Sequence, residues 1–180
     1  MLNIVDNIPL LEDILGVYRD SVGAQFDPYR NHVYRVVNYC FAFWDCQGDD
    51  QDKLVIAGCF HDLGIWPEDH WDYLPLSIER AKQYLSEKDN PHWSDEIVQM
   101  IDLHHRFRAV AKGVSPLVEV FRKGDWVDAS LGWRRFGLDR SVIREVSCQF
   151  PNLGFHRNLF RLGFKQLVRH PLNPMPMMKW

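Results

Sequence analysis

Residues 54–64 read Leu54-Val55-Ile56-Ala57-Gly58-Cys59-Phe60-His61-Asp62-Leu63-Gly64, an apolar run that ends in a histidine and an aspartate. The run predicts a buried helix, and Gly64 indicates where that helix gives way to a turn. An unpaired charge is costly to bury, so two adjacent polar side chains at a core-facing helix end point to a bound partner. A divalent metal ion would satisfy His61 and Asp62 together.

The bulk composition predicts one globular domain. The chain has 180 residues, of which 46% are hydrophobic and 25% are charged, as in ordinary soluble proteins. Its formal net charge of -3 predicts no general attraction to nucleic acid or to an anionic membrane. We therefore expect a small-molecule substrate as the partner, with no nucleic-acid polymer and no membrane, and a homodimer is compatible with the sequence.

Several features favour a cytoplasmic location. No apolar stretch approaches the ~20 residues of a membrane-spanning helix, and residues 1–6 lack the basic start and apolar centre of a signal peptide. Four cysteines are present, and Cys40 and Cys59 lie in apolar helical runs. Their spacing is not that of a metal site, so buried free thiols are the simpler interpretation.

Apolar residues recur at helical spacing along most of the chain, and strand-like alternation is scarce, which predicts an all-α fold. Asp27, Ser94 and Asp139 are expected to cap helices. Eight helices are expected. The first opens at Pro9, the second runs from Asp27 to Trp44, the third follows Asp50 and ends at Asp62, and the fourth covers about 75–87. The fifth runs from Ser94 to about His105, the sixth covers 116–131, the seventh follows Asp139 and the eighth covers 155–168. A metal-binding core would span about 27–131, followed by the C-terminal helices and Pro-rich tail over 139–180. Within that tail, residues 171–180 contain three prolines and are expected to pack as an extended strap.

Polar residues lie on the apolar faces of several expected helices. His32, His104 and Asp125 each lie three, four or seven residues from apolar residues of their own helix, so each is expected to face the core. His61 and Asp62 end a further helix. A metal site inside a helical bundle is built in this way, because facing helices each contribute inward ligands.

Four motifs in this order resemble the HD superfamily of metal-dependent hydrolases: Arg30-Asn31-His32-Val33, Phe60-His61-Asp62-Leu63-Gly64, Ile101-Asp102-Leu103-His104-His105 and Gly124-Asp125-Trp126-Val127-Asp128. The resemblance covers about Asp27 to Leu131. It implies that His32, His61, Asp62 and Asp125 ligate one divalent cation in the core of the bundle. Asp128, one helical turn further on, is the competing ligand, and Asp125 is preferred because it follows Gly124 as in the family.

Two imidazoles and two carboxylates suit Mn, Fe, Co, Ni or Zn. Such an ion lowers the pKa of bound water towards ~7 and so supplies hydroxide at neutral pH. Asp62 would hold the metal and orient this water. The general acid is left open among four residues, namely Glu68, Asp69, His70 and His104.

The chain departs from some subgroups of the superfamily. Members with two metals use an extra His early in the helix after the doublet, and residues 73–80 contain none, so one ion is favoured. His104 and His105 are nevertheless available for a second ion. Nucleotide-cleaving members commonly place an acid or His where this chain has Ile65, although His70 and Pro67 match the triphosphohydrolase pattern. A nucleotidase mechanism of that kind is therefore weakened.

The resemblance and the residues around it leave several functions open. The first is a phosphohydrolase acting on a small phosphorylated or nucleotide-like compound, with Arg106, Arg108 and Lys123 as anion-binding residues. Those charges could equally form a solvated face. The second is a hydratase or hydrolase of a small C–N substrate, because Ile65 and the segment 150–155 are similar to cyanamide-hydratase-like members. A di-iron oxygenase is disfavoured by the missing His, and a non-catalytic regulatory domain is the remaining alternative.

Overall fold

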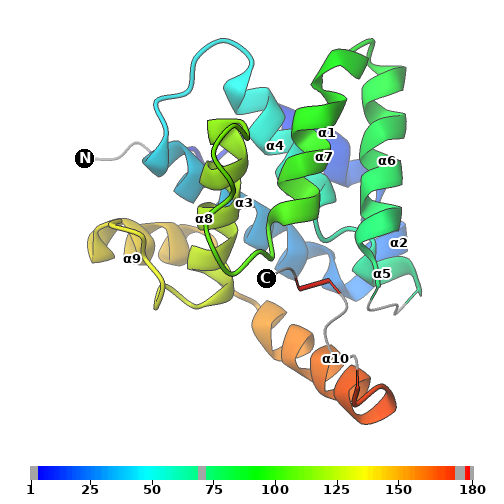
Figure 1. Cartoon of the computed structure of the whole chain (residues 1–180). Helices are drawn as coiled ribbons and strands as arrows, with labels where there is room; N and C mark the ends of the chain where they lie inside the picture. The colour runs from blue at the N-terminus through cyan, green and yellow to red at the C-terminus, as the bar shows by residue number, and fades with distance from the viewer. Residues whose placement is uncertain (1–3, 69–71, 173–176, 179–180) are drawn as a thin grey trace.

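The computed structural model describes residues 4–68, 72–172 and 177–178, and the described residues form helices and turns without a strand (Figure 1). The expected all-α class is confirmed. None of the described helices is both long enough and apolar enough to span a membrane. In chain order the elements are α1 (Pro9–Val17), α2 (Arg19–Val22), the 3₁₀ turn η1 (Gly23–Gln25), α3 (Phe26–Phe43), α4 (Asp50–Phe60), α5 (Ile65–Glu68), α6 (Leu74–Glu87), the 3₁₀ turn η2 (Pro91–Trp93), α7 (Ser94–Leu103), α8 (Pro116–Ala129), α9 (Arg140–Gln149) and α10 (Phe155–Arg169).

Helix α3 is the central element of the fold. Every residue from Asn31 to Cys40 is buried, because α4, α8, α9 and α10 all pack around this helix (Figure 1). The contact with α8 is the most extensive and depends on Gly124. A Cβ atom at Gly124 would lie 2.6 Å from Cys40 Sγ and 3.0 Å from the Val36 carbonyl oxygen. Glycine therefore allows the α8 backbone to approach α3 and brings the next residue, Asp125, into the core.

The turn after α4 is also shaped by a glycine. Helix α4 ends at Phe60, and residues 61–64 form a turn that leads into the short helix α5, which the sequence does not predict. A Cβ atom at Gly64 would lie 2.5 Å from the Tyr73 carbonyl oxygen. The Gly64 amide instead donates a 3.0 Å hydrogen bond to Ser77 Oγ. The start of α6 is thereby held beside His61 and Asp62.

Two of the three expected helix caps are not formed. Helices α3 and α7 each continue directly from a 3₁₀ turn, so Asp27 and Ser94 lie inside the first turn and neither caps its helix. Because the preceding turn already runs into the helix, a side-chain cap is not needed there. At α9 the expected cap is confirmed, since Asp139 Oδ1 accepts a 2.7 Å hydrogen bond from the Ser141 amide.

The C-terminal part returns to the core at several points. Leu138, Val146, Phe150 and Phe155 are buried, and so is Met177 near the chain end. Most of the predicted strap over 171–180 lies outside the described residues, so its extended form stays a prediction. The described fold brings α3, α8 and the turn after α4 together around a buried polar cluster.

Candidate metal centre

Four polar side chains meet in the core, and each is buried. His32 comes from α3, His61 and Asp62 from the turn after α4, and Asp125 from α8. The Nε2 atoms of His32 and His61 are 2.9 Å apart. Asp62 Oδ2 lies 3.8 and 3.6 Å from these two nitrogens, and Asp125 Oδ1 also lies 3.8 and 3.6 Å from them. The structure therefore brings the four predicted metal ligands to one point.

The other nitrogen of each imidazole faces an acceptor. His32 Nδ1 lies 2.7 Å from Asp128 Oδ2, and His61 Nδ1 lies 2.7 Å from the Gly58 carbonyl oxygen. A carbonyl and an ionised carboxylate can only accept, so both Nδ1 atoms carry the proton. Both Nε2 lone pairs are consequently directed at the centre of the cluster.

Two inward lone pairs and two carboxylates at this separation require a cation. A shared proton or a metal ion can supply the positive charge, and without either the buried groups repel one another. Imidazole nitrogens and carboxylate oxygens are common ligands of divalent transition metals. The hydrogen bonds behind the two rings are those that orient metal-bound histidines. The residues present fit one divalent ion.

Asp128 lies behind the cluster and does not face its centre. Its carboxylate accepts hydrogen bonds from Arg35 Nε at 2.5 Å and Arg35 Nη2 at 2.9 Å, as well as contacting His32. Burial would raise the pKa of Asp128, but Arg35 and His32 outweigh it and hold the pKa well below its ordinary range. Asp125 is therefore the residue positioned to ligate, whereas Asp128 orients His32.

A second group of potential ligands shares Asp62 with the first. One ligand atom each from Asp62, His104 and His105 can be chosen so that all lie within 4.8 Å of one another. The Tyr73 hydroxyl occupies part of this space, since it donates to Asp62 Oδ1 at 2.6 Å and lies 2.6 Å from His105 Nε2. The side chains thus form one complete ligand set, His32, His61, Asp62 and Asp125. Beside it lies a second set, Asp62, His104 and His105, in which the Tyr73 hydroxyl lies between Asp62 and His105.

His104 also directs a buried ring nitrogen towards Asp62. Its Nδ1 atom donates to the Ile101 carbonyl oxygen at 2.6 Å, so Nε2 bears the lone pair. Nε2 lies 3.5 Å from Asp62 Oδ1 and has no hydrogen-bond partner among the described residues. Buried polar atoms are rarely left unpaired, so this nitrogen is available to water, substrate or a second ion.

The pKa values of the cluster reflect its crowding. Burial favours the neutral ring of His61, but the carboxylates of Asp62 and Asp125 outweigh it and raise the pKa of His61 to about 9. Burial would raise the pKa of Asp62, yet the positive charge of His61 outweighs it and holds the pKa well below its ordinary value. Desolvation, together with repulsion by His104, lowers the pKa of the half-buried His105 to about 3. Without metal, His61 is thus the site that holds a proton at neutral pH.

A pocket of about 660 Å³ adjoins this cluster. Asp62, Tyr73 and His105 contribute to its wall, and most of the remaining lining is apolar. Helix α10 supplies Leu159, Phe160, Gly163, Phe164 and Leu167, and the chain end supplies Met177 and Met178. Among the described lining residues none is Arg or Lys. The cluster is therefore reached through an apolar cavity.

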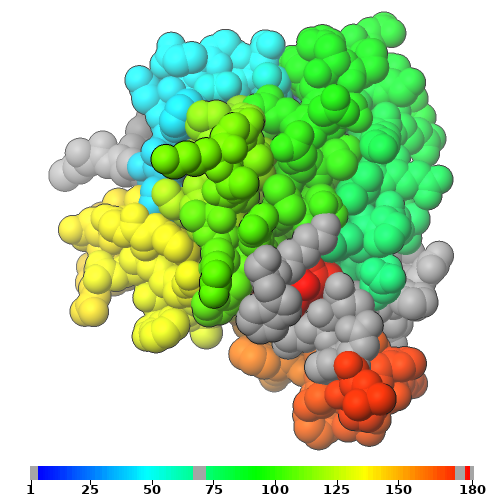
Figure 2. Space-filling view, in the orientation of Figure 1, coloured from blue at the N-terminus to red at the C-terminus, as the bar shows by residue number. Residues whose placement is uncertain are grey.

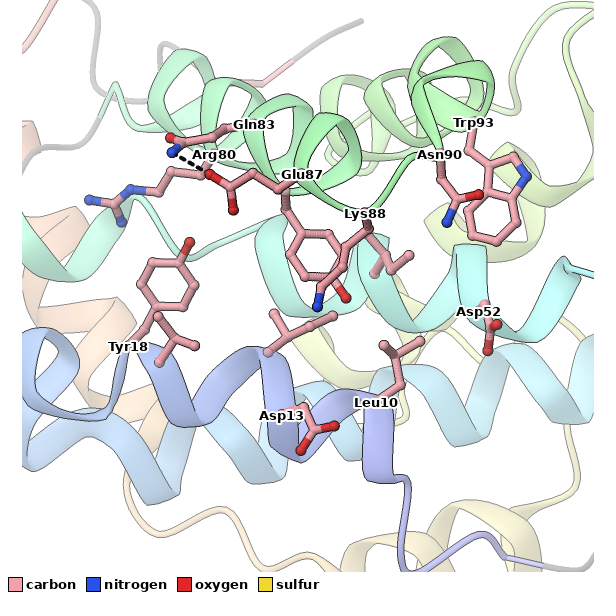
Figure 3. Close-up of a pocket in the computed structure, with 14 residues that line it drawn as sticks. Leu10, Asp13, Tyr18, Asp52, Arg80, Gln83, Glu87, Lys88, Asn90 and Trp93 are labelled. Carbon is pink, nitrogen blue, oxygen red and sulfur yellow. Dashed lines mark hydrogen bonds between the residues drawn. The ribbon is translucent and has the colours of Figure 1, made fainter.

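A separate pocket of about 590 Å³ lies between α1, α4 and α6 (Figure 3). Charged side chains such as Asp13, Arg80 and Glu87 line it, and Gln83 donates a 2.8 Å hydrogen bond to Glu87 across one side. None of the histidines or aspartates of the cluster contributes to this wall. The candidate site is therefore the apolar pocket and not this one.

The predicted anion-binding residues are not brought to the pocket. Lys123 Nζ lies 3.8 Å from Glu119 Oε1, and Arg108 is exposed in the loop after α7. Arg106 uses its carbonyl oxygen to accept hydrogen bonds from Arg122 and Trp126, each at 3.1 Å, and its side chain does not line the pocket. Of the other proposed acids, the Glu68 side chain, Asp69 and His70 lie outside the described residues.

Several residues at the site are absent from the sequence-based prediction. The Phe155 ring stacks on His32, with ring centroids 4.2 Å apart and an interplanar angle of 16°. His156 Nε2 donates a 2.8 Å hydrogen bond to the Asp128 carbonyl oxygen. Both residues begin α10, more than 100 positions after His32, and no local pattern links them to it. Tyr73 likewise carries no sequence signal of its position beside Asp62.

The fold and cluster define a helical domain built around a buried His/Asp cluster that fits a divalent ion. The sequence profile of the HD domain matches residues 29–130, which is more than half of the chain and includes all four predicted ligands. The chain belongs to the HD domain family, whose members are generally metal-dependent hydrolases. Searches of curated proteins and of solved structures gave no significant match.

Proposed function

We propose that this protein is a metal-dependent hydrolase of a small molecule that has an apolar body. The observation that carries the proposal is the meeting of the apolar pocket with the His/Asp cluster at Asp62, which belongs to both. Tyr73, which donates to Asp62, and His105 of the adjoining ligand set also line the pocket. The reacting group would then lie at the ligands while the rest of the molecule fills the cavity beside α10. Small-molecule sites commonly combine an apolar wall with a few convergent polar groups.

His32 and His61 would hold the ion through Nε2, and Asp62 and Asp125 would hold it through their carboxylates. When bound, a divalent ion lowers the pKa of water towards ~7 and supplies a hydroxide nucleophile at neutral pH. The chain has to keep these ligands deprotonated and aligned. Asp128 and the Gly58 carbonyl oxygen do this by fixing the proton of each ring on Nδ1.

His104 is the residue best placed to move a proton. Its Nε2 atom is buried, unpaired among the described residues and 3.5 Å from Asp62 Oδ1. A general acid or base has to come within hydrogen-bond reach of the proton that it moves, and such contacts are often longer in the apo protein than in the substrate complex. We assign proton transfer to His104, with Tyr73 and His105 fixing the orientation of Asp62 beside it.

A phosphomonoester of an apolar alcohol or phenol is the first candidate substrate. Its phosphoryl group would lie at Asp62, which lines the pocket, is one of the proposed ligands of the single ion and has His104 Nε2 at 3.5 Å from its Oδ1 atom. The positive charge would come from bound metal, since the described pocket wall contains no Arg or Lys. An apolar ester is therefore expected to react faster than a nucleotide.

A nitrile or amide is the second candidate, and the pocket lining favours it. A neutral C–N group needs no cationic rim, and the described wall offers mainly aliphatic, aromatic and Met side chains. Hydration or hydrolysis at carbon would use the same nucleophile. The two candidate reactions use the same metal ligands and the same pocket. They differ in the atom that is attacked, which is phosphorus in the ester and carbon in the nitrile or amide.

The test is a substrate panel with metal-stripped enzyme reloaded with Mn, Fe, Co, Ni or Zn. Aryl phosphates, nucleoside monophosphates, aryl nitriles and aryl amides are compared by kcat/KM. Leu159→Asn should raise KM for the apolar substrates, while Leu172→Asn, at a residue that is 99% exposed, should not. If His61→Ala retains the activity of the loaded wild type, or if no substrate turns over with any metal, the proposal is wrong.

A further inference from the structure

Helix α10 has one strongly basic side. Arg157, Arg161, Lys165 and Arg169 recur at intervals of four, and the helix contains no Asp or Glu. Residues four apart lie on one face of a helix, so the four cations form a row along it. The three arginines of this row are exposed.

An apolar row lies beside the basic one. Phe160 is 73% exposed, Phe164 is 68% exposed and Val168 is 66% exposed, again at intervals of four. Leu167 adds a further apolar side chain that is 45% exposed. Large apolar side chains gathered on one face of a protein mark an interaction site. The exposed side of α10 therefore carries a basic row and an apolar row next to each other.

Positive charge is also concentrated in the C-terminal part of the chain as a whole. Residues 140–180 contain seven Lys and Arg and a single Glu, whereas residues 1–139 contain fourteen Lys and Arg against 23 Asp and Glu. The overall net charge of -3 conceals this division. Charge asymmetry between parts of a chain favours contact with an anionic surface through the basic part.

We propose that α10 docks this protein on the surface of an anionic phospholipid bilayer. A basic amphipathic helix lies in the bilayer interface with its apolar side chains at the acyl boundary and its cations among the headgroups. Helix α10 stands out at the lower edge of the molecule in Figures 1 and 2, where a flat surface can reach it. Two copies pairing through this face would instead bring their arginine rows together, which like-charge repulsion opposes.

Docking through α10 has a consequence for the apolar pocket. Phe160, Phe164 and Leu167 belong both to the exposed face and to the pocket wall that reaches Asp62. The mouth of the pocket would therefore lie against the bilayer. A substrate with an apolar body could enter from the lipid without crossing water. The docking itself does not depend on the proposed hydrolase activity.

The experiment is co-sedimentation of the full chain with two kinds of vesicle, phosphatidylcholine alone and phosphatidylcholine mixed with phosphatidylglycerol. We expect binding to the mixed vesicles that weakens as salt is raised, and little binding to phosphatidylcholine. Each interfacial cation contributes roughly fivefold in affinity, so Arg157→Gln with Arg161→Gln should lose about 25-fold. Phe160→Ser with Phe164→Ser should abolish the binding.

Two variants provide matched controls. Arg140→Gln with Arg144→Gln removes the same charge from exposed positions of α9, and Trp133→Ser removes an aromatic that is 85% exposed elsewhere. Both should bind vesicles within about twofold of wild type. Melting temperatures establish that the α10 variants are folded.

Three results would overturn the proposal. They are no binding to the anionic vesicles at low salt, an equal loss in the α9 control, and a sedimentation shift from dimer to monomer in the α10 variants without any vesicle binding. The last result would identify this face as an interface between two copies.

Discussion

His32 and Asp128 are joined by a 2.7 Å contact between Nδ1 and Oδ2, on the side of the imidazole opposite to His61. Arg35 holds the same carboxylate with two further hydrogen bonds, so Asp128 links two buried groups of α3 to α8. The contact fixes both the tautomer and the direction of the His32 ring, which is one of the proposed metal ligands. Asp128 is for this reason a positioning residue.

Asp128→Asn should weaken metal binding by roughly 10- to 100-fold, because an amide orients His32 less firmly and does not raise the basicity of the ring. The measurement is the Kd for Mn or Zn, with the melting temperature recorded alongside because Arg35 also loses its ionic partner. Asp95→Asn, at an exposed position of α7, is the matched control and should bind metal as wild type does. Wild-type affinity in Asp128→Asn would contradict the assigned role.

Tyr73→His should allow the protein to bind a second divalent ion. In the wild type, the phenol bridges Asp62 Oδ1 and His105 Nε2, at 2.6 Å from each. Replacing it by an imidazole would add a fourth ligand to Asp62, His104 and His105. Elemental analysis should give about one ion per wild-type chain and about two in the variant. A wild type that already binds two ions, or a variant that binds one, would refute this explanation of metal number.

Gly124→Ala should lower the free energy of unfolding by roughly 1–3 kcal/mol, as overpacking in a close helix contact does. The added Cβ would lie 2.6 Å from Cys40 Sγ and 3.0 Å from a backbone oxygen, so α8 would have to move away from α3. Gly16→Ala is the control, because nothing lies within 4 Å of its Cβ position and α1 gains helix propensity. Equal denaturant midpoints for the two variants would show that the α3–α8 approach is not tight.

The metal-free protein should lose stability between pH 6.5 and 9. His61 has its pKa raised to about 9 by Asp62 and Asp125 against the opposing effect of burial, compared with an ordinary value of 6.5. The folded state therefore binds this proton more tightly than the unfolded chain. Its contribution is complete below pH 6.5 and is lost as the pH rises through 9, amounting to about 3 kcal/mol. Urea unfolding with a chelator measures it.

The metal-bound protein gives the comparison for this pH dependence. Metal replaces the proton on His61, so the stability of the metal-bound protein should change far less between pH 6.5 and 9. Metal uptake at pH 7 should release about one proton. Calorimetry in buffers of different ionisation enthalpy counts that proton. Chelated protein whose stability is constant from pH 6.5 to 9 would show that His61 is not the protonated group.

The site residues that could be predicted from the sequence are those whose position follows from local spacing. His32, His104 and Asp125 lie at helical intervals from apolar neighbours, so each could be placed on a buried face, and His61 and Asp62 follow an apolar run directly. The all-α class and most helix bounds came from the same periodicity. The expected caps at Asp27 and Ser94 are absent because 3₁₀ turns lead into those helices, and residue preference does not reveal such turns.

The sequence by itself determined the fold class, the family and the residue types that could hold a metal, because each depends on short-range pattern. Only the tertiary structure decided that Asp125 faces the cluster while Asp128 stands behind His32, since both aspartates lie on the buried side of α8. It also placed Tyr73 beside Asp62, moved Arg108 and Lys123 away from the pocket, and put the apolar side of α10 at its mouth. These relations join residues of different elements, from 11 positions apart for Asp62 and Tyr73 to 96 for His32 and Asp128. Helix packing sets such distances in a way that periodicity does not encode.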